Sequence, residues 1–262
     1  MPGESSAGPE GHGTTGPDPV LMAAVAMVFV DDPALPVLTQ GDAHHLLDVL
    51  RLRPGELVVA SDGAGSWVPC RLVATAGGRG SREVDLASVV EVDGPVATDP
   101  RPGPAITVAF APTKGDRPEW VTQKLTELGV DRIVPIRTAR SVVRWDGERG
   151  DRAVERLRRV AREASAQCRR PWLPEVGDVL GLDQLGPDLD CVPSLTQPGG
   201  DPPTLRRPVL AVGPEGGWDQ VELDRFGVGT GLGPTVLRAE TAAVTAGAVL
   251  CALRNGVVKS LA

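Results

Sequence analysis

Aromatic residues are scarce in this 262-residue chain: five Trp and three Phe make up 3% of the sequence, and tyrosine is absent. A buried core must therefore be built mainly from Val, Leu and Ala. The length is ample for such a core, in one large domain or two smaller ones. Lysine is also rare, with only Lys114, Lys124 and Lys259. Recognition of an anionic partner would depend on arginine, whose planar guanidinium suits phosphate.

Cysteine is infrequent, and its spacing excludes two kinds of site. Cys70, Cys168, Cys191 and Cys251 form no CxxC pair, and no His stands at metal-ligand spacing near them. We expect neither a metal site nor a disulfide framework, but buried thiols of a cytoplasmic protein.

The apolar run at residues 20–30 covers only about a third to a half of a membrane span. Acidic residues, rather than Lys or Arg, precede it, which is the wrong charge for a secretion signal. We therefore expect no membrane association. Residues 1–22, rich in Gly, Pro, Ser and Thr at their start, are expected to form a disordered tail.

The net charge of -7 argues against a uniformly basic nucleic-acid binder. Residues 137–172 nevertheless hold eleven Arg against five acidic residues, a local charge of +6, so the remainder carries -13. One basic stripe on an acidic body is typical of a local RNA contact, and a solvated charged helix would look the same.

Two sequence patterns predict two domains, separated by a Pro-rich linker at 99–104. Short β runs and turns indicate a small β-barrel at 23–98, with strands at 25–30, 57–61, 67–74 and 83–92 and a helix at 41–50. Strand–helix alternation over 104–262 predicts an α/β fold with a mainly parallel sheet. Its expected strands are 106–111, 130–136, 190–194 and 209–213, and its expected helices are 118–128, 151–170, 219–226 and 240–254.

The sharpest local signal is the Gly-rich turn Gly213-Pro214-Glu215-Gly216-Gly217, which directly follows an apolar strand. Such a turn exposes backbone groups where α/β sheets bind ligands. The pattern is neither GxGxxG nor a phosphate-binding P-loop, so it does not indicate NAD or ATP. A tight turn with no role in ligand binding would also be rich in glycine.

A second small-residue loop leads into the last helix, whose first turn holds Glu240. A carboxylate there is favoured by the helix dipole, so a capping role is the simple alternative for Glu240. Arg238 stands at the mouth of the same sheet, which packing explains less well.

Two helices carry charged residues with two possible roles. Lys124 and Glu127 could pair on the helix surface at i, i+3. The helix at 151–170 has an apolar stripe that includes Cys168, and an Arg-rich face that could contact RNA or solvent. The apolar stripe is Val154, Leu157, Ala161, Ala164 and Cys168, and the other face is Arg152, Arg156, Arg159, Glu163 and Arg170.

Taken together, these segments resemble the 16S rRNA uridine-N3 methyltransferase family of the SPOUT superfamily. The match runs from about Ala26 to the C-terminus. The N-terminal motifs are His44-His45-Leu46, Val49-Leu50-Arg51 and Asp62-Gly63. The C-terminal motifs, in the family's order, are Lys114-Gly115, residues 123–130, Gln167-Cys168 with Arg170, the turn at 213–217, and Leu237-Arg238-Ala239-Glu240-Thr241. The spacing of the last two is highly specific. The resemblance implies a C-terminal trefoil-knot domain preceded by a PUA-like β-barrel that binds RNA.

The resemblance also implies a homodimer that binds S-adenosylmethionine and 16S rRNA of the 30S subunit. It assigns the cofactor site to Leu210, Val212, Gly213, Pro214, Glu215, Gly216, Gly217, Leu232, Gly233, Val236, Leu237 and Arg238. It assigns RNA contacts to Lys114, Lys124, Arg140, Arg144, Arg170, His45 and Arg51.

The expected reaction moves a methyl group to uracil N3, which carries a proton, so a base or a polarising cation is needed. We expect Arg238 to stabilise negative charge on the uracil oxygens. Glu215 and Glu240 are candidates for proton handling or for orienting Arg238. Methylation at C5 would call for a Cys nucleophile, and neither loop contains one.

The chain departs from the family at a few positions. Ala239 replaces the usual Thr, Ala139 and Ala166 replace common acidic residues, and Arg169 replaces Gly. The usual basic residue near Met27 is absent. Two alternatives stay open: a SPOUT enzyme with another RNA target such as tRNA, and an inactive RNA-binding assembly factor.

Overall fold

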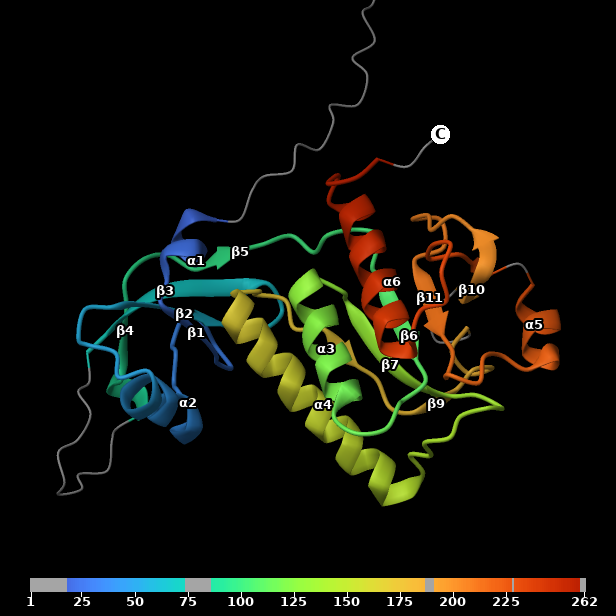
Figure 1. Cartoon of the computed structure of the whole chain (residues 1–262). Coiled ribbons are helices and arrows are strands. Elements are labelled where there is room, and N and C mark those ends of the chain that lie inside the picture. Colours follow the sequence, from blue (N-terminus) through green and yellow to red (C-terminus); the bar gives the residue numbers. More distant parts are fainter. Residues whose placement is uncertain (1–17, 74–85, 187–190, 228, 260–262) are drawn as a thin grey trace, which may run out of the picture.

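The computed structural model describes residues 18–73, 86–186, 191–227 and 229–259. They form two parts, each with its own sheet, and the end of the long helix α4 (Gly147–Cys168) lies against the N-terminal part (Figure 1).

The N-terminal part is a mixed five-stranded sheet. β1 (Ala26–Phe29) pairs parallel with β2 (Leu57–Ser61), and β2 pairs antiparallel with β3 (Ser66–Leu72). β3 also pairs antiparallel with β4 (Val90–Val92) and β5 (Ala97–Thr98). The expected helix at 41–50 is α2 (Gln40–His44), continued by a π-helical turn at His45–Val49. Its Leu46 and Leu47 are buried against one sheet face.

Part of the tail expected to be disordered is ordered, so that prediction is wrong for its last residues; residues 1–17 lie outside the described chain. The helix α1 (Pro19–Ala23) begins where the Asp18 carboxylate accepts a hydrogen bond from the Val20 N–H at 2.7 Å. Leu21 is buried with Met27, Phe29 and other apolar residues of the sheet's second core. Burial of this one leucine gives the helix a tertiary anchor that its composition does not reveal.

Two expected strands have different bounds. In the region expected as a strand at 83–92, residues 83–85 lie outside the described chain, Leu86–Ser88 forms a 3-10 helix, and only Val90–Val92 is a strand. The strand expected at 190–194 is instead β10 (Ser194–Asp201). Its start fits the chemistry, because the preceding Pro193 has no N–H to donate to a ladder.

The C-terminal part contains a six-stranded sheet in which every pairing between the described strands is parallel, as expected from the sequence. The order is β10–β11–β6–β7–β8, and β9 also pairs with β7. The strands are β6 (Thr107–Phe110), β7 (Arg132–Arg137), β8 (Glu175–Val176), β9 (Leu180–Gly181), β10 and β11 (Val209–Val212).

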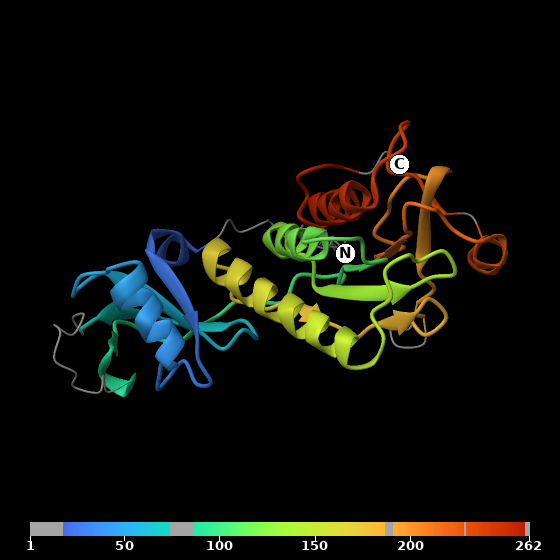
Figure 2. The same ribbon diagram turned by 60° about the horizontal axis from the view of Figure 1, so that its bottom comes forward.

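Helices α3 (Arg117–Leu128) and α6 (Ala239–Arg254) lie side by side, and α4 packs against α3 (Figure 2). The predicted apolar stripe of α4 is buried, at Val154, Leu157, Ala161 and Ala164. These helices and the sheet share one large core, in which the small residues of α6 allow close packing. The short α5 (Gln220–Phe226) lies beside β10 at the other end of the domain.

The chain around Thr230 passes between two stretches of β10. Thr230 forms bridges to both Thr196 and Asp201, and its neighbours hydrogen-bond to Asp201 on either side. The passage is tight, since a Cβ on Gly229 would lie 2.2 Å from the Leu195 carbonyl oxygen. The absence of a side chain at Gly229 is therefore what lets the chain pass so close to β10.

Candidate active site

Strand β11 ends in the Gly-rich turn, so the turn lies at the carboxyl edge of the parallel sheet. The turn is closed by a hydrogen bond from the Gly217 N–H to the Pro214 carbonyl at 2.9 Å. The ring of Trp218 folds back over Gly213, where a Cβ would lie only 3.0 Å from the ring. The Trp218 indole N–H donates to the Thr196 carbonyl at 2.8 Å, which fixes the ring. Gly213 is therefore required by a close ring contact.

The loop at 232–238 faces this turn across a cavity of about 570 Å³. Apolar side chains, Pro and exposed backbone make up most of its wall, in keeping with a small-molecule site. Ten of the predicted cofactor residues line it: Val212, Gly213, Pro214, Glu215, Gly217, Leu232, Gly233, Val236, Leu237 and Arg238.

Two predicted cofactor residues do not line the cavity. Leu210 is fully buried in the core between sheet and helices, on the same face of β11 as Val212 but two residues further from the carboxyl end of the strand. Gly216 lies on the outer side of the turn, where a Cβ would be 3.5 Å from the Cβ of Arg140.

Eight residues that line the cavity were not predicted from the sequence, and they come from three places in the chain. They are Thr196, Gln197, Pro198, Trp218, Leu223, Thr235, Ala239 and Ala242. Trp218 adjoins the Gly-rich turn and could have been included from its position alone. Residues 196–198 carried no local signal, since it is the pairing of β10 with β11 that brings them to the turn.

The charged residues at the cavity are arranged differently from expectation. Arg238 lines the cavity as the residue preceding α6 and is exposed. Glu215 and Glu240 are not paired with it; both approach Arg117 in the first turn of α3, at 3.3 and 3.7 Å. Orientation of Arg238 by these glutamates is therefore not what the structure shows. Arg117 was not singled out in the sequence, because nothing local distinguished it from other arginines.

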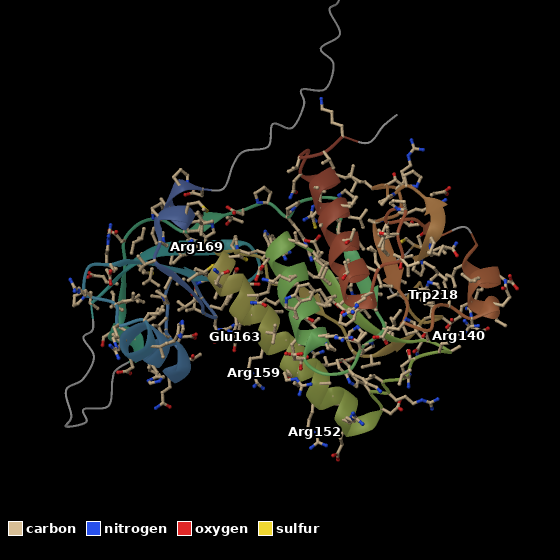
Figure 3. All side chains as sticks on the ribbon, viewed as in Figure 1. Arg140, Arg152, Arg159, Glu163, Arg169 and Trp218 are labelled. Atoms are coloured by element: carbon tan, nitrogen blue, oxygen red, sulfur yellow. The ribbon has the colours of Figure 1, made fainter. Side chains whose placement is uncertain are left out.

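Most of the expected RNA contacts are exposed. Lys114, Arg144, His45 and Arg51 lie on the surface. Arg140 is exposed and also donates to the Gly216 carbonyl at 3.1 Å, so it contacts the Gly-rich turn. Lys124 pairs with Glu127 at 2.8 Å, which is the surface pair considered as its alternative role. Figure 3 shows Arg152 and Arg159 extending outward from α4.

Arg170, in contrast, is turned inward. Its guanidinium donates to the carbonyls of Thr126 and Val130 and pairs with the buried Asp131 at 3.3 Å. Burial lowers the pKa of Arg170 from its ordinary value, with partial compensation by Asp131. The assignment of Arg170 to RNA contact is wrong, because its donors serve the C-terminal end of α3 and the start of β7.

All four cysteines are free thiols. Cys70 and Cys251 are buried, and burial raises their pKa to about 11. Cys168 and Cys191 are only partly buried, so the expectation of burial is wrong for these two. Among the described residues, no group of three or more His, Cys, Asp or Glu is placed to hold a metal ion, and no helix is long and apolar enough to cross a membrane.

Family models give the class of protein. Residues 100–251 match the RNA methyltransferase domain, and residues 38–79 match the RNA methyltransferase PUA domain. These matches coincide with the parallel-sheet part and the smaller β part. Fold and site together therefore define an RNA methyltransferase with an N-terminal PUA-type domain, as the resemblance implied.

Similar proteins narrow the class. Ribosomal RNA small subunit methyltransferase E of Bacillus subtilis is 30% identical over 226 residues, covering 78% of this chain and 85% of that protein. The Mycobacterium bovis protein of that name is 34% identical over 247 residues, covering 85% and 90%. The chain belongs to the ribosomal RNA small subunit methyltransferase E family.

Solved structures agree with this placement. A Neisseria gonorrhoeae protein of that name, bound to S-adenosyl methionine, matches with a TM-score of 0.69 and 27% identity over 87% of this chain and 97% of that one. A putative methyltransferase from Legionella pneumophila, in complex with the same cofactor, matches with a TM-score of 0.70 and 26% identity over 86% and 96%.

Proposed function

We propose that this chain transfers a methyl group from S-adenosylmethionine to N3 of a uridine in the 16S rRNA of the 30S subunit. Membership of the ribosomal RNA small subunit methyltransferase E family supports the substrate, and the cofactor-bound relatives support the methyl donor. The observation that carries the proposal is the cavity between the turn at 213–217 and the loop at 232–238. An rRNA substrate places the activity in the cytoplasm.

The residues around the cavity fit this cofactor. Val212, Leu232 and Leu237 offer apolar contacts for a purine ring. The turn lacks side chains at Gly213 and Gly217, so ligand atoms can reach its backbone N–H and C=O groups. When bound, S-adenosylmethionine supplies a methyl group on a positively charged sulfur, ready for displacement.

The role we assign to Arg238 is electrostatic. Uracil N3 gains nucleophilic character as its proton leaves, and negative charge then spreads to the neighbouring oxygens. An exposed guanidinium at the cavity wall is placed to stabilise that charge. Across the described residues, no ion pair or hydrogen bond occupies the side chain of Arg238, so its donors are available to substrate.

We assign RNA binding to basic residues on both parts of the molecule: the exposed Lys114, Arg140, Arg144, His45 and Arg51, and the half-buried Lys124. The Arg-rich face of α4 lies between the two parts and can continue the same surface (Figure 3). The target base must leave its stack to reach the cavity, as in other enzymes that modify bases.

We also propose a homodimer. The residues of α6 that lie outside the core include the half-buried Val244, Val249 and Leu253. Trp120 on the neighbouring α3 is 45% exposed and Val236 at the cavity is 87% exposed. Apolar surface of this kind marks protein contacts. Analytical ultracentrifugation should give a dimer for the wild type and a monomer for Val249→Arg.

Methyl transfer from labelled S-adenosylmethionine tests the function. Equal amounts of 30S subunits, free 16S rRNA and tRNA would be incubated with the chain, and the RNA digested to nucleosides. The proposal expects N3-methyluridine from 16S rRNA. Label in tRNA would support another RNA target, and cofactor binding with no transfer to any RNA would support an inactive assembly factor.

A further inference from the structure

Arg117 links the two walls of the cavity to a third element. Its Nη1 donates to Glu215 Oε1 at 3.3 Å, in the Gly-rich turn. Its Nε lies 3.7 Å from Glu240 Oε1, in the first turn of α6. One guanidinium on α3 therefore contacts both the Gly-rich turn that follows β11 and the first turn of α6.

Both glutamates are engaged by Arg117, and only Glu215 of the two lines the cavity. The nearest cation to each is Arg117, and neither pairs with Arg238 among the described residues. The Glu240 side chain is only 14% exposed, and its Oε2 is shielded from solvent without a hydrogen-bond partner in the described chain. A base that takes a proton from uracil must lie within hydrogen-bond reach of substrate.

We propose that Arg117 is a positioning residue that clasps Glu215 and Glu240, and that both glutamates hold the cofactor cavity in shape instead of accepting a proton. This inference rests on the proposed function. The clasp joins the first turn of α3, the Gly-rich turn and the first turn of α6. Arg117 is 42% exposed and Glu215 55% exposed, so the pairs add little to overall stability. Their effect falls on the geometry of the bound cofactor, which depends on where the walls lie.

A double-mutant cycle on the full chain tests the clasp. The dissociation constant of S-adenosylmethionine would be measured by calorimetry for Arg117→Gln, Glu215→Gln and the double variant. Each single change should weaken binding roughly fivefold, and the double variant should be no weaker than the worse single one. Arg117→Lys should recover part of the loss. Arg71→Gln breaks a comparably exposed ion pair in the N-terminal part and should bind like wild type.

The pH profile of turnover separates positioning from chemistry. The clasp predicts that Glu215→Gln and Glu240→Gln keep the wild-type shape of kcat against pH. A loss of about a hundredfold in kcat with a flattened profile and normal cofactor affinity would instead make that glutamate the proton acceptor. Additive losses in the cycle would overturn the clasp while leaving the methyltransferase intact. A wild-type chain that binds no cofactor would overturn the proposed function and the clasp together.

Discussion

Asp131 is the residue on which the packing of the C-terminal part most depends. It is 1% exposed, pairs with Arg170 and Arg254, and accepts the Ile106 N–H at 2.8 Å. Arg254 in turn donates to the Gly129 carbonyl at 2.8 Å. A single buried carboxylate therefore joins the ends of α3, α4 and α6 and the start of β6, and both guanidinium groups share it as their anionic partner.

Removing this carboxylate should be costly. Asp131→Ala leaves two largely buried guanidinium groups without their anion, and we expect a loss of about 3–5 kcal/mol in the free energy of unfolding. Urea denaturation followed by circular dichroism would measure it. Asp178→Ala is the matched control, because Asp178 is 81% exposed in its pair with Arg158 and should cost less than about 1 kcal/mol. Equal losses for both variants would contradict the assigned role of Asp131.

The thiols differ in reactivity because they differ in burial. A pKa of about 11 leaves Cys70 and Cys251 almost entirely protonated at pH 8, and thiolate is the reactive form. We expect Ellman's reagent to titrate no more than two thiols in the native protein and four after denaturation. Cys191 is less buried than Cys168, so it should be the faster-reacting of these two thiols, and the fast phase should disappear in Cys191→Ser. Rapid modification of Cys70 in the folded protein at pH 8 would be inconsistent with this structure.

Residue roles were predictable only where the neighbouring sequence decided them. The Gly-rich turn lies beside the cavity as expected, because a strand that ends in glycines fixes its own location at the sheet edge. The role of Arg170 was predicted wrongly, and Arg117 was not singled out. The direction in which an arginine side chain points depends on which carboxylate the fold brings near it. Asp131 and Glu240, which lie far from these arginines in sequence, decide both cases.

Among the secondary-structure elements, α4 ends in an unusual way. Arg169 follows its last residue with φ of 56°, a left-handed conformation that glycine adopts at much lower cost. The Arg169 Nε donates to the Ala24 carbonyl at 2.7 Å in the N-terminal part. The side chain that replaces the family's glycine therefore connects the two parts of the molecule.

Two substitutions separate the energetic cost of the left-handed backbone at Arg169 from the loss of its hydrogen bond to Ala24. Arg169→Ala and Arg169→Gly both remove the hydrogen bond to Ala24, but only alanine keeps a Cβ in the left-handed conformation. We expect the glycine variant to be more stable than the alanine variant by about 1 kcal/mol. Thermal unfolding of the two proteins measures the difference. If alanine were the more stable replacement, the left-handed end of α4 would be wrong.

The long elements were predictable and the shortest ones were not. The apolar spacing of α3 and α4 and the apolar run of β2 predicted whether each element is a helix or a strand and where it lies in the chain, because these signals are local and repeated. The two-residue strands β5, β8 and β9 exist only through their hydrogen-bonded neighbours, so no periodicity reveals them. The helix α1 depends in the same way on the burial of Leu21 by a distant sheet.

At the level of the entire molecule, the contact between the two parts is built around Trp172. Its indole N–H donates to the Asp99 carbonyl at 3.0 Å, and its ring lies where a Cβ on Gly65 would be 2.5 Å away. Arg101 stacks over the ring at 5.3 Å from its centroid. The Pro-rich linker expected to be a spacer therefore takes part in this contact.

Loss of Trp172 should uncouple the two parts. We expect the wild-type chain to unfold in one calorimetric transition, because the contact is closely packed. Trp172→Ala removes a large ring from that contact and should give two resolved transitions, or a destabilisation of about 3–5 kcal/mol. Two separate transitions already present in the wild type would show that the contact does not couple the parts.

The knot that the family resemblance implies is a feature of the entire molecule that composition could not reveal. The tight passage at Gly229 comes from contacts between residues 194–201 and 229–231. Such contacts bring Thr196 and Gln197 to the cavity and complete its wall. The site is thus a product of topology as much as of the two conspicuous loops.

The most direct test of the account is nucleoside analysis of 16S rRNA from 30S subunits treated with labelled S-adenosylmethionine and either the wild-type chain or Arg238→Ala. The account predicts N3-methyluridine with the wild type, and turnover reduced by roughly a hundredfold or more for the variant while cofactor affinity changes little. Normal turnover by Arg238→Ala would contradict the role of that residue. The absence of N3-methyluridine in the wild-type reaction would contradict the proposed function itself.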